Sequence, residues 1–143
     1  MPRTSIAVFT QAAEQAQHWV NELAADLGWT EQRAHRLLRI VLHTLRDWLS
    51  PEESADLSAQ LPLLVRGIYF EGWAPEGSGP VWNRSKEVFL TRVEDDFLDD
   101  ILEDPQSAVA AVFRLLDRHI AHGEIVQVRN SMKKSLRELW PAG

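Results

Sequence analysis

Residues 30–49 read TEQRAHRLLRIVLHTLRDWL and form the most strongly periodic segment of the chain. Thr30 stands just before the apolar positions, where its hydroxyl can cap a helix by accepting a backbone N–H. Side chains spaced three and four residues apart lie on one face of an α-helix. The segment therefore predicts a helix with a wide buried stripe, made of Ala34, Leu37, Leu38, Val41, Leu42, Leu45, Trp48 and Leu49.

The segments on either side of this stretch also have the helical period. Residues 5–27 predict a helix that Gly28 closes, because glycine adopts left-handed backbone angles without strain. Ser50-Pro51-Glu52-Glu53 predicts a second start, with Ser50 as cap and Glu53 completing a capping box. A short helix to about residue 60 and another over 63–71 follow. The stripe of the first helix is Phe9, Ala13, Ala16, Val20, Leu23, Ala24 and Leu27.

Beyond residue 71 the chain becomes rich in turn formers and then helical again. Residues 72–80 contain three glycines and two prolines and are interpreted as a linker. Helices are predicted over 85–101 and from Asp104-Pro105 to about residue 121, and a helix or a pair of helices over 124–140. No window alternates as a strand would. We predict an all-α protein, one globular bundle of about seven to eight helices.

The two halves of the chain are similar to each other. From residue 45 onward they align without gaps at an offset of 71 residues, and upstream the cap Thr30 falls on Asp104 at an offset of 74. The aligned pairs are Leu45 and Leu116, Leu49 and Ile120, Glu53 and Glu124, Leu57 and Val128, Leu61 and Met132, Arg66 and Arg137, Ile68 and Leu139, and Tyr69 and Trp140.

This alignment predicts a duplicated helical unit. A unit of about 60 residues buries too little apolar surface to be stable by itself, so two units are expected to share one core. We predict a single domain over 1–143, with one pseudo-repeat over 5–73, a linker over 74–83 and a second pseudo-repeat over 84–141.

Composition narrows the class of protein. The chain has 143 residues, 45% hydrophobic and 25% charged, with no cysteine and a formal charge of −6. Without cysteine it can form no disulfide, thiolate nucleophile or cysteine-ligated metal site. No apolar run approaches the ~20 residues that span a bilayer, and no signal peptide precedes the first helix. We expect a soluble cytoplasmic protein that does not bind membranes.

Several sequence motifs resemble one family. They are Phe9, His18-Trp19, residues 41–46 (VLHTLR), residues 59–62 (AQLP), residues 66–70 (RGIYF), residues 72–75 (GWAP), Gly123-Glu124 and residues 136–141 (LRELWP). The chain resembles the bacterial proteins known as domain of unknown function 2267. The resemblance implies a helical, internally duplicated bacterial domain and brings no functional residues with it. Met132-Lys133 stands where the second copy usually has Leu-Pro, so the last two helices are either separate or continuous.

Paired charges and histidines are the candidates for chemistry. Glu53 with Arg66, and their counterparts in the second half, are interpreted as a capping glutamate and an arginine that either reaches that glutamate or stays in solvent, rather than as an active pair. His119 and His122 would lie on one side of a helix end, as metal ligands do, but a third ligand is not evident. The chain has no phosphate loop, nucleophile elbow or zinc-protease motif. We predict no metal or cofactor and favour a non-enzymatic role.

The remaining candidates are surfaces. Arg36, Arg39, His43 and Arg46 form a basic stripe, interpreted as a docking surface for a protein or for nucleic-acid phosphate, and the acidic segment 95–104 is a natural complement to it in a second copy. Trp73 and Trp82 bracket the linker, either as anchors or as an aromatic groove for an extended peptide.

These observations lead to one preferred function and two alternatives. The sequence favours an interaction module that binds another protein or itself. The first alternative is a nucleic-acid-binding protein that uses the basic helix faces, which the net charge of −6 disfavours. The second is a metal-dependent enzyme that uses His119 and His122.

Overall fold

The computed structural model describes residues 6–74, 85–131 and 137–140. Within these residues it contains seven α-helices and no strand, which confirms the predicted all-α helical bundle. The helices are α1 (Ala7–Leu27), α2 (Glu31–Trp48), α3 (Pro51–Ser58), α4 (Leu63–Phe70), α5 (Lys86–Asp95), α6 (Pro105–His119) and α7 (His122–Ser131). Among them, none is both long and apolar enough to cross a membrane.

Local sequence determines most helix ends. Gly28 ends α1 with a left-handed φ of 69°. Thr30, Ser50 and Asp104 each accept a hydrogen bond from the backbone N–H three residues on, as the caps predicted for α2, α3 and α6. In addition, the carboxylate of Glu53 accepts a hydrogen bond of 3.0 Å from the backbone N–H of Ser50, which completes the predicted capping box. These bonds satisfy donors that a helix N-terminus leaves without an intrahelical partner.

The prediction was wrong at the end of α5. The helix was expected to reach residue 101, but it ends at Asp95. Aspartates crowd the residues that follow, and negative charge at a helix C-terminus opposes the helix dipole. In addition, Arg36 of α2 donates a hydrogen bond to the carbonyl of Asp96, which satisfies an acceptor that the ended helix leaves free. A contact from a distant helix thus stabilises this end.

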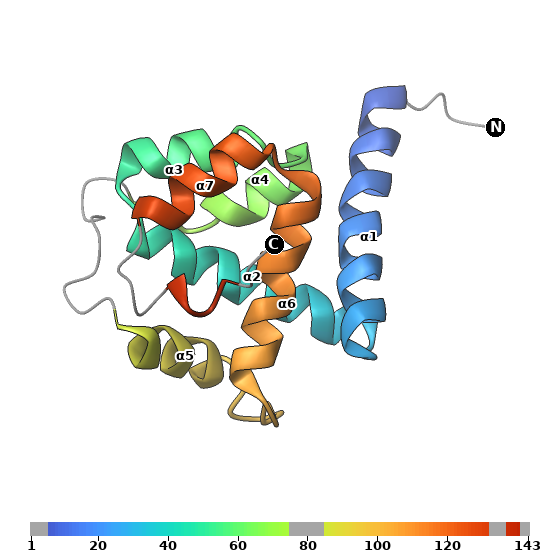
Figure 1. Cartoon of the computed structure of the whole chain (residues 1–143). Helices are drawn as coiled ribbons and strands as arrows, with labels where there is room; N and C mark the ends of the chain where they lie inside the picture. Colours follow the sequence, from blue (N-terminus) through green and yellow to red (C-terminus); the bar gives the residue numbers. More distant parts are fainter. Residues whose placement is uncertain (1–5, 75–84, 132–136, 141–143) are drawn as a thin grey trace.

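The helices surround α2, which crosses the centre of the molecule (Figure 1). It contacts α1, α4, α5 and α6. In the view of Figure 1, α3, α4 and α7 gather at the top, α5 lies at the bottom, and α1 stands along one side. One core joins the two halves, and in it Trp48 of α2 packs edge-on against Phe89 of α5, with ring centroids 5.3 Å apart. Within the second half, Phe113 of α6 stacks on Trp140 with centroids 4.3 Å apart. Trp48 is 3% exposed, as predicted.

Helix bounds follow the predicted offsets between the halves. The ends of α2 and α6, Trp48 and His119, are 71 residues apart, and so are the starts of α3 and α7, Pro51 and His122. That the two units superpose stays a prediction. Whether the last two helices are continuous depends on residues 132–136, which lie outside the described residues, as does the linker after residue 74.

Candidate functional site

The exposed part of the predicted basic stripe is paired within the chain. The Nε of Arg39 donates to Glu71 at 2.8 Å, and this hydrogen bond lowers the pKa of the Glu71 carboxyl. Arg36 binds Asp96 and Asp99, with its Nη2 2.7 Å from the carboxylate of Asp99. The acidic segment 95–104, which the sequence suggested as a complement to these arginines in a second copy, therefore already contacts Arg36 within one molecule, and the partner of Arg39 is Glu71.

The other two members of the stripe are internal. Arg46 is 8% exposed and donates to the carbonyls of Tyr69 and Glu71 at 3.0 and 2.9 Å. His43 is also buried, with its Nε2 2.6 Å from the carbonyl of Ile68, to which it can only donate. The last carbonyls of a helix have no intrahelical donors. His43 and Arg46 thus cap the C-terminus of α4 and attach it to α2.

Because His43 is buried, its protonation is linked to folding. Loss of water around the ring lowers the pKa of His43 below its ordinary 6.5; Arg46 and Arg39 nearby lower it further, while the bond to Ile68 opposes the shift. The unfolded chain binds the proton more readily. The free energy of unfolding should therefore fall as pH drops below about 6.5. Above that pH, the stabilisation that comes from keeping His43 neutral should be fully present.

Urea unfolding at about pH 7.5 and pH 5.5 measures this linkage. The variant His43→Gln keeps a donor for the Ile68 carbonyl but does not titrate, so its stability should depend less on pH than that of the parent chain. The remaining histidines contribute equally to both proteins. Equal pH dependence would show that His43 is not the group responsible.

The duplicated charge pair has a structural role in the first half. Glu53 belongs to the capping box of α3. Arg66 does not bind it; its guanidinium donates to three carbonyls at the end of α3 and in the turn to α4, those of Ser58, Ala59 and Leu61, at 3.0 to 3.4 Å. In the second half, the Arg137 side chain is exposed.

The side chain of His119 contacts residues of α1, and the structure does not bring it together with His122 as a pair of metal ligands. The Nε2 of His119 contacts the carboxylate of Glu22, and its ring stacks on Trp19 with centroids 4.7 Å apart. The neighbouring Arg118 binds Asp26, also on α1. These contacts hold α1 against the C-terminal end of α6.

Metal ligands are not assembled in the part of the chain that the structure describes. His122 is exposed at the start of α7. No group of three or more potential ligands is found among residues 6–74, 85–131 and 137–140. Metal-dependent chemistry stays a prediction without a described site to support it.

Of the two tryptophans predicted to bracket the linker, the described residues include Trp73. Trp73 is half-buried and packs on Phe70, with ring centroids 5.1 Å apart. Trp82 lies outside the described residues. The contact of Trp73 agrees with an anchoring role at the end of α4, and an aromatic peptide groove stays a prediction.

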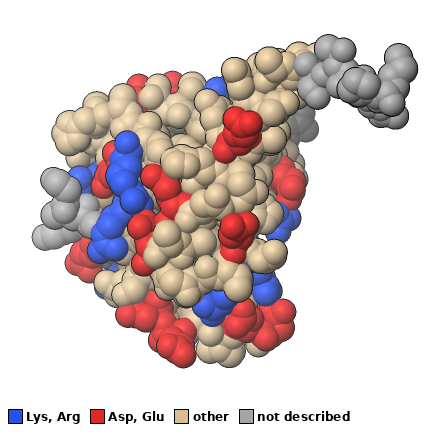
Figure 2. All heavy atoms as spheres, turned by 90° about the vertical axis from the view of Figure 1, so that its right-hand side faces the viewer, with Lys and Arg blue, Asp and Glu red and all other residues tan. Residues whose placement is uncertain are grey.

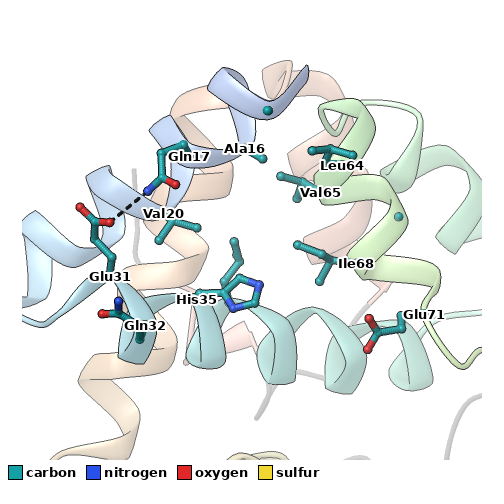
Figure 3. Close-up of a pocket in the computed structure, with 13 residues that line it drawn as sticks. Ala16, Gln17, Val20, Glu31, Gln32, His35, Leu64, Val65, Ile68 and Glu71 are labelled. Atoms are coloured by element: carbon teal, nitrogen blue, oxygen red, sulfur yellow. Dashed lines mark hydrogen bonds between the residues drawn. The ribbon is translucent and has the colours of Figure 1, made fainter. Parts of the chain in front are cut away.

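A groove that sequence reasoning missed lies between three helices of the first half (Figure 3). Its volume is about 660 Å³. One wall is α1, with Ala13, Ala16 and Val20; the other is α4, with Leu64, Val65 and Ile68. The floor is α2, where His35 and Leu38 lie between the walls. The walls are apolar because the helical period directs the stripes of α1 and α4 toward each other.

Polar side chains mark the edges of this groove. Figure 3 shows Glu31 and Gln17 at the α1 side, joined by a hydrogen bond of 3.2 Å, and Glu71 at the α4 side. Near the middle of α4, Gly67 leaves open space, since a Cβ there would meet no atom within 4 Å. The arrangement offers an apolar trough with polar edges, and its described lining residues do not form a group of metal ligands.

The family described as uncharacterised conserved protein, DUF2267, matches residues 16–139. The chain belongs to the DUF2267 family. The match covers α2 to α7 and the part of α1 from Ala16 onward, so it includes the floor of the groove, the α4 wall and all of the α1 wall except Ala13. Among curated proteins, none matches this DUF2267 chain.

The sequence did contain a signal for the groove. The stripe of α1 begins at Phe9, and its later members Val20, Leu23 and Ala24 are buried, but Phe9 is 65% exposed. An apolar stripe longer than the body against which it packs leaves part of itself uncovered. The sequence predicts both helix lengths, but that the short α4 packs against α1 depends on how the helices assemble.

Proposed function

We propose that this DUF2267 protein is a non-enzymatic interaction module that binds an amphipathic helix in the groove between α1, α2 and α4. The observation that carries the proposal is the uncovered apolar surface of the groove and its surroundings. Leu64 on one wall is 46% exposed, and the neighbouring Leu63 and Phe9 are 54% and 65% exposed. Leu63 and Phe9 each lie within one helical turn of a residue that lines the groove, and clustered exposed apolar side chains mark sites of protein interaction.

The shape of the groove favours a helix as the ligand. Two helical walls on a helical floor form the trough used in helix-in-groove recognition, where apolar side chains at i, i+3, i+4 and i+7 enter the groove. Exposed apolar side chains also occur within one helical turn of the lining, at Phe9 and Leu63, so the ligand we propose is longer than the groove itself. Gln17, Glu31 and Glu71 at the edges can orient the polar face of the ligand.

The basic surface supports the nucleic-acid alternative less well. Figure 2 looks onto the α1 side of the molecule, and there Lys and Arg side chains lie among Asp and Glu side chains. Arg36 and Arg39 are paired with carboxylates, so phosphate would have to displace these partners. We also infer a cytoplasmic location, which the cysteine-free composition favours, and a bacterial origin, which the resemblance to DUF2267 proteins implies.

A substitution at Gly67 tests the proposal. Gly67→Leu should fill the groove and weaken helix binding at least about tenfold, which corresponds to about 1.4 kcal/mol. Because glycine inside a helix is unfavourable, the variant should also be more stable by about 0.5–1 kcal/mol. The probes are designed amphipathic peptides with leucine at i, i+3, i+4 and i+7 and with either lysine or glutamate on the outer face. Binding is measured by fluorescence anisotropy.

The matched control is Gly123→Leu in α7, where a Cβ also meets no atom within 4 Å. This variant should bind as the parent chain does, and amide NMR shifts on peptide addition should map to α1 and α4. Absence of binding by every peptide, or equal binding by the two leucine variants, would overturn the proposed function.

A further inference from the structure

We propose that the helix that occupies the groove is the N-terminal half of α1 from a second copy of this chain, so that two copies form a symmetric dimer. This inference rests on the proposed function and names its partner. It follows from the distribution of apolar, polar and charged side chains along α1.

The N-terminal half of α1 is poorly covered by its own molecule. Of the five buried residues of α1, four belong to its C-terminal half, and Ala12 alone belongs to the first. Phe9 is 65% exposed and Ile6, just before the helix, is 59% exposed. Figure 1 shows α1 standing along the side of the bundle with this half pointing toward the end where α3 and α4 lie.

The exposed residues continue the wall of the groove. Phe9 is four residues before Ala13, which lines the groove, so both lie on one face of α1. Following the same face gives Ile6, Phe9, Ala13, Ala16 and Val20, large side chains at one end and small ones in the middle. The end with the large side chains can therefore act as a ligand, and the stretch from Ala13 to Val20, which lines the groove, can act as part of the receptor.

Such a face is complementary to itself when two copies run antiparallel. With a two-fold axis near Ala13, Phe9 of one copy lies opposite Gln17 of the other, and Ile6 lies opposite Val20. The large side chains therefore enter the partner's groove, whose far wall offers Leu64. Alanines at the crossing let the two helices approach closely, because interaxial distance depends on the side chains at the contact. Each interaction occurs twice, as in an isologous interface.

Charge supports the choice of this face over the rest of α1. On the groove side, α1 contributes Ala13, Ala16, Gln17 and Val20, none of which is charged. The other side of α1 carries Gln11, Glu14, Gln15 and His18, which line a separate polar cleft with His119. An antiparallel pair through the groove side thus brings no like charges of α1 together.

Sedimentation equilibrium of the full chain across the micromolar range tests the dimer. The parent chain should dimerise, and Phe9→Glu should weaken the dimer at least tenfold. Leu98→Glu is the matched control, because Leu98 is 71% exposed but lies in the connection between α5 and α6, far along the sequence from the groove. It should leave the dimer unchanged.

Disulfide trapping tests the geometry, since the chain contains no cysteine. Ala13→Cys, near the proposed axis, should cross-link two copies on mild oxidation. Gln15→Cys, exposed on the other side of α1, should not. A monomer at all concentrations, a dimer insensitive to Phe9→Glu, or equal cross-linking at both positions would overturn the inference.

Failure here is distinguishable from failure of the proposed function. If the chain is monomeric but binds amphipathic peptides in a manner blocked by Gly67→Leu, the second copy is not the partner while the groove remains a helix-binding site. If neither dimer nor peptide binding responds to Gly67→Leu, both proposals fail together.

Discussion

Trp48→Ala is expected to lower the free energy of unfolding by about 3–5 kcal/mol, the range for truncating a buried aromatic side chain. Trp48 ends α2, is 3% exposed and contacts Phe89 on α5 edge-on at 5.3 Å. Alanine would leave a cavity at the junction between the two halves of the chain. Urea unfolding curves measure the loss, and a change below ~1 kcal/mol would show that the apolar stripe of α2 does not carry the core.

A second substitution at this position separates packing from hydrogen bonding. The Nε1 of Trp48 is buried and has no hydrogen-bond partner among the described residues. Trp48→Phe retains an aromatic ring against Phe89 and removes the unsatisfied donor, which itself costs free energy when buried. This variant should lose less than half as much stability as Trp48→Ala. A loss as large as that of the alanine variant would mean that the indole itself is required.

Arg46→Ala should cost about 2–4 kcal/mol, because it leaves two buried or half-buried carbonyls at the end of α4 without donors. Arg46 binds the carbonyls of Tyr69 and Glu71 and is 8% exposed. Arg39→Ala is the matched control on the same helix, since its side chain is 45% exposed and its ion pair with Glu71 lies at the surface. Surface ion pairs contribute less than about 1 kcal/mol.

The stability of the Arg46→Ala variant also decides which variants can test the basic stripe for binding. If Arg46→Ala destabilises the fold as expected, a binding assay that removes Arg36, Arg39 and Arg46 together would report unfolding as well as lost contacts. The double variant Arg36→Ala, Arg39→Ala is then the informative one. Equal stability of the Arg46 and Arg39 variants would mean that Arg46 is not a cap and is free for a ligand.

Local interactions explain why so much of the helical structure could be predicted. The cap of α3 depends on Ser50, Pro51 and Glu53, which are neighbours in the chain, and the φ of Gly28 depends on the absence of its own Cβ. The burial of Trp48 followed from its place on a stripe of period 3.6. Each of these features involves residues within one or two helical turns, so the sequence displays them directly.

Contacts between distant helices decided the rest. Arg36 and Asp99 are 63 residues apart, and only the packing of α2 against α5 joins them. This packing adds to the effect of the local aspartates in ending α5 early, and it occupies an arginine that the sequence presents as free. His43 and Arg46 have the spacing of an exposed polar face, yet α4 covers them. The groove has the same origin: α1 has 21 residues and α4 has 8, so the short helix cannot cover the long stripe. By itself, the sequence determined most helix ends and which faces are apolar, because these depend on near neighbours, and the early end of α5 was the exception. Which charged groups are satisfied and which apolar face stays open depend on how helices of unequal length meet, and only the tertiary structure decided that.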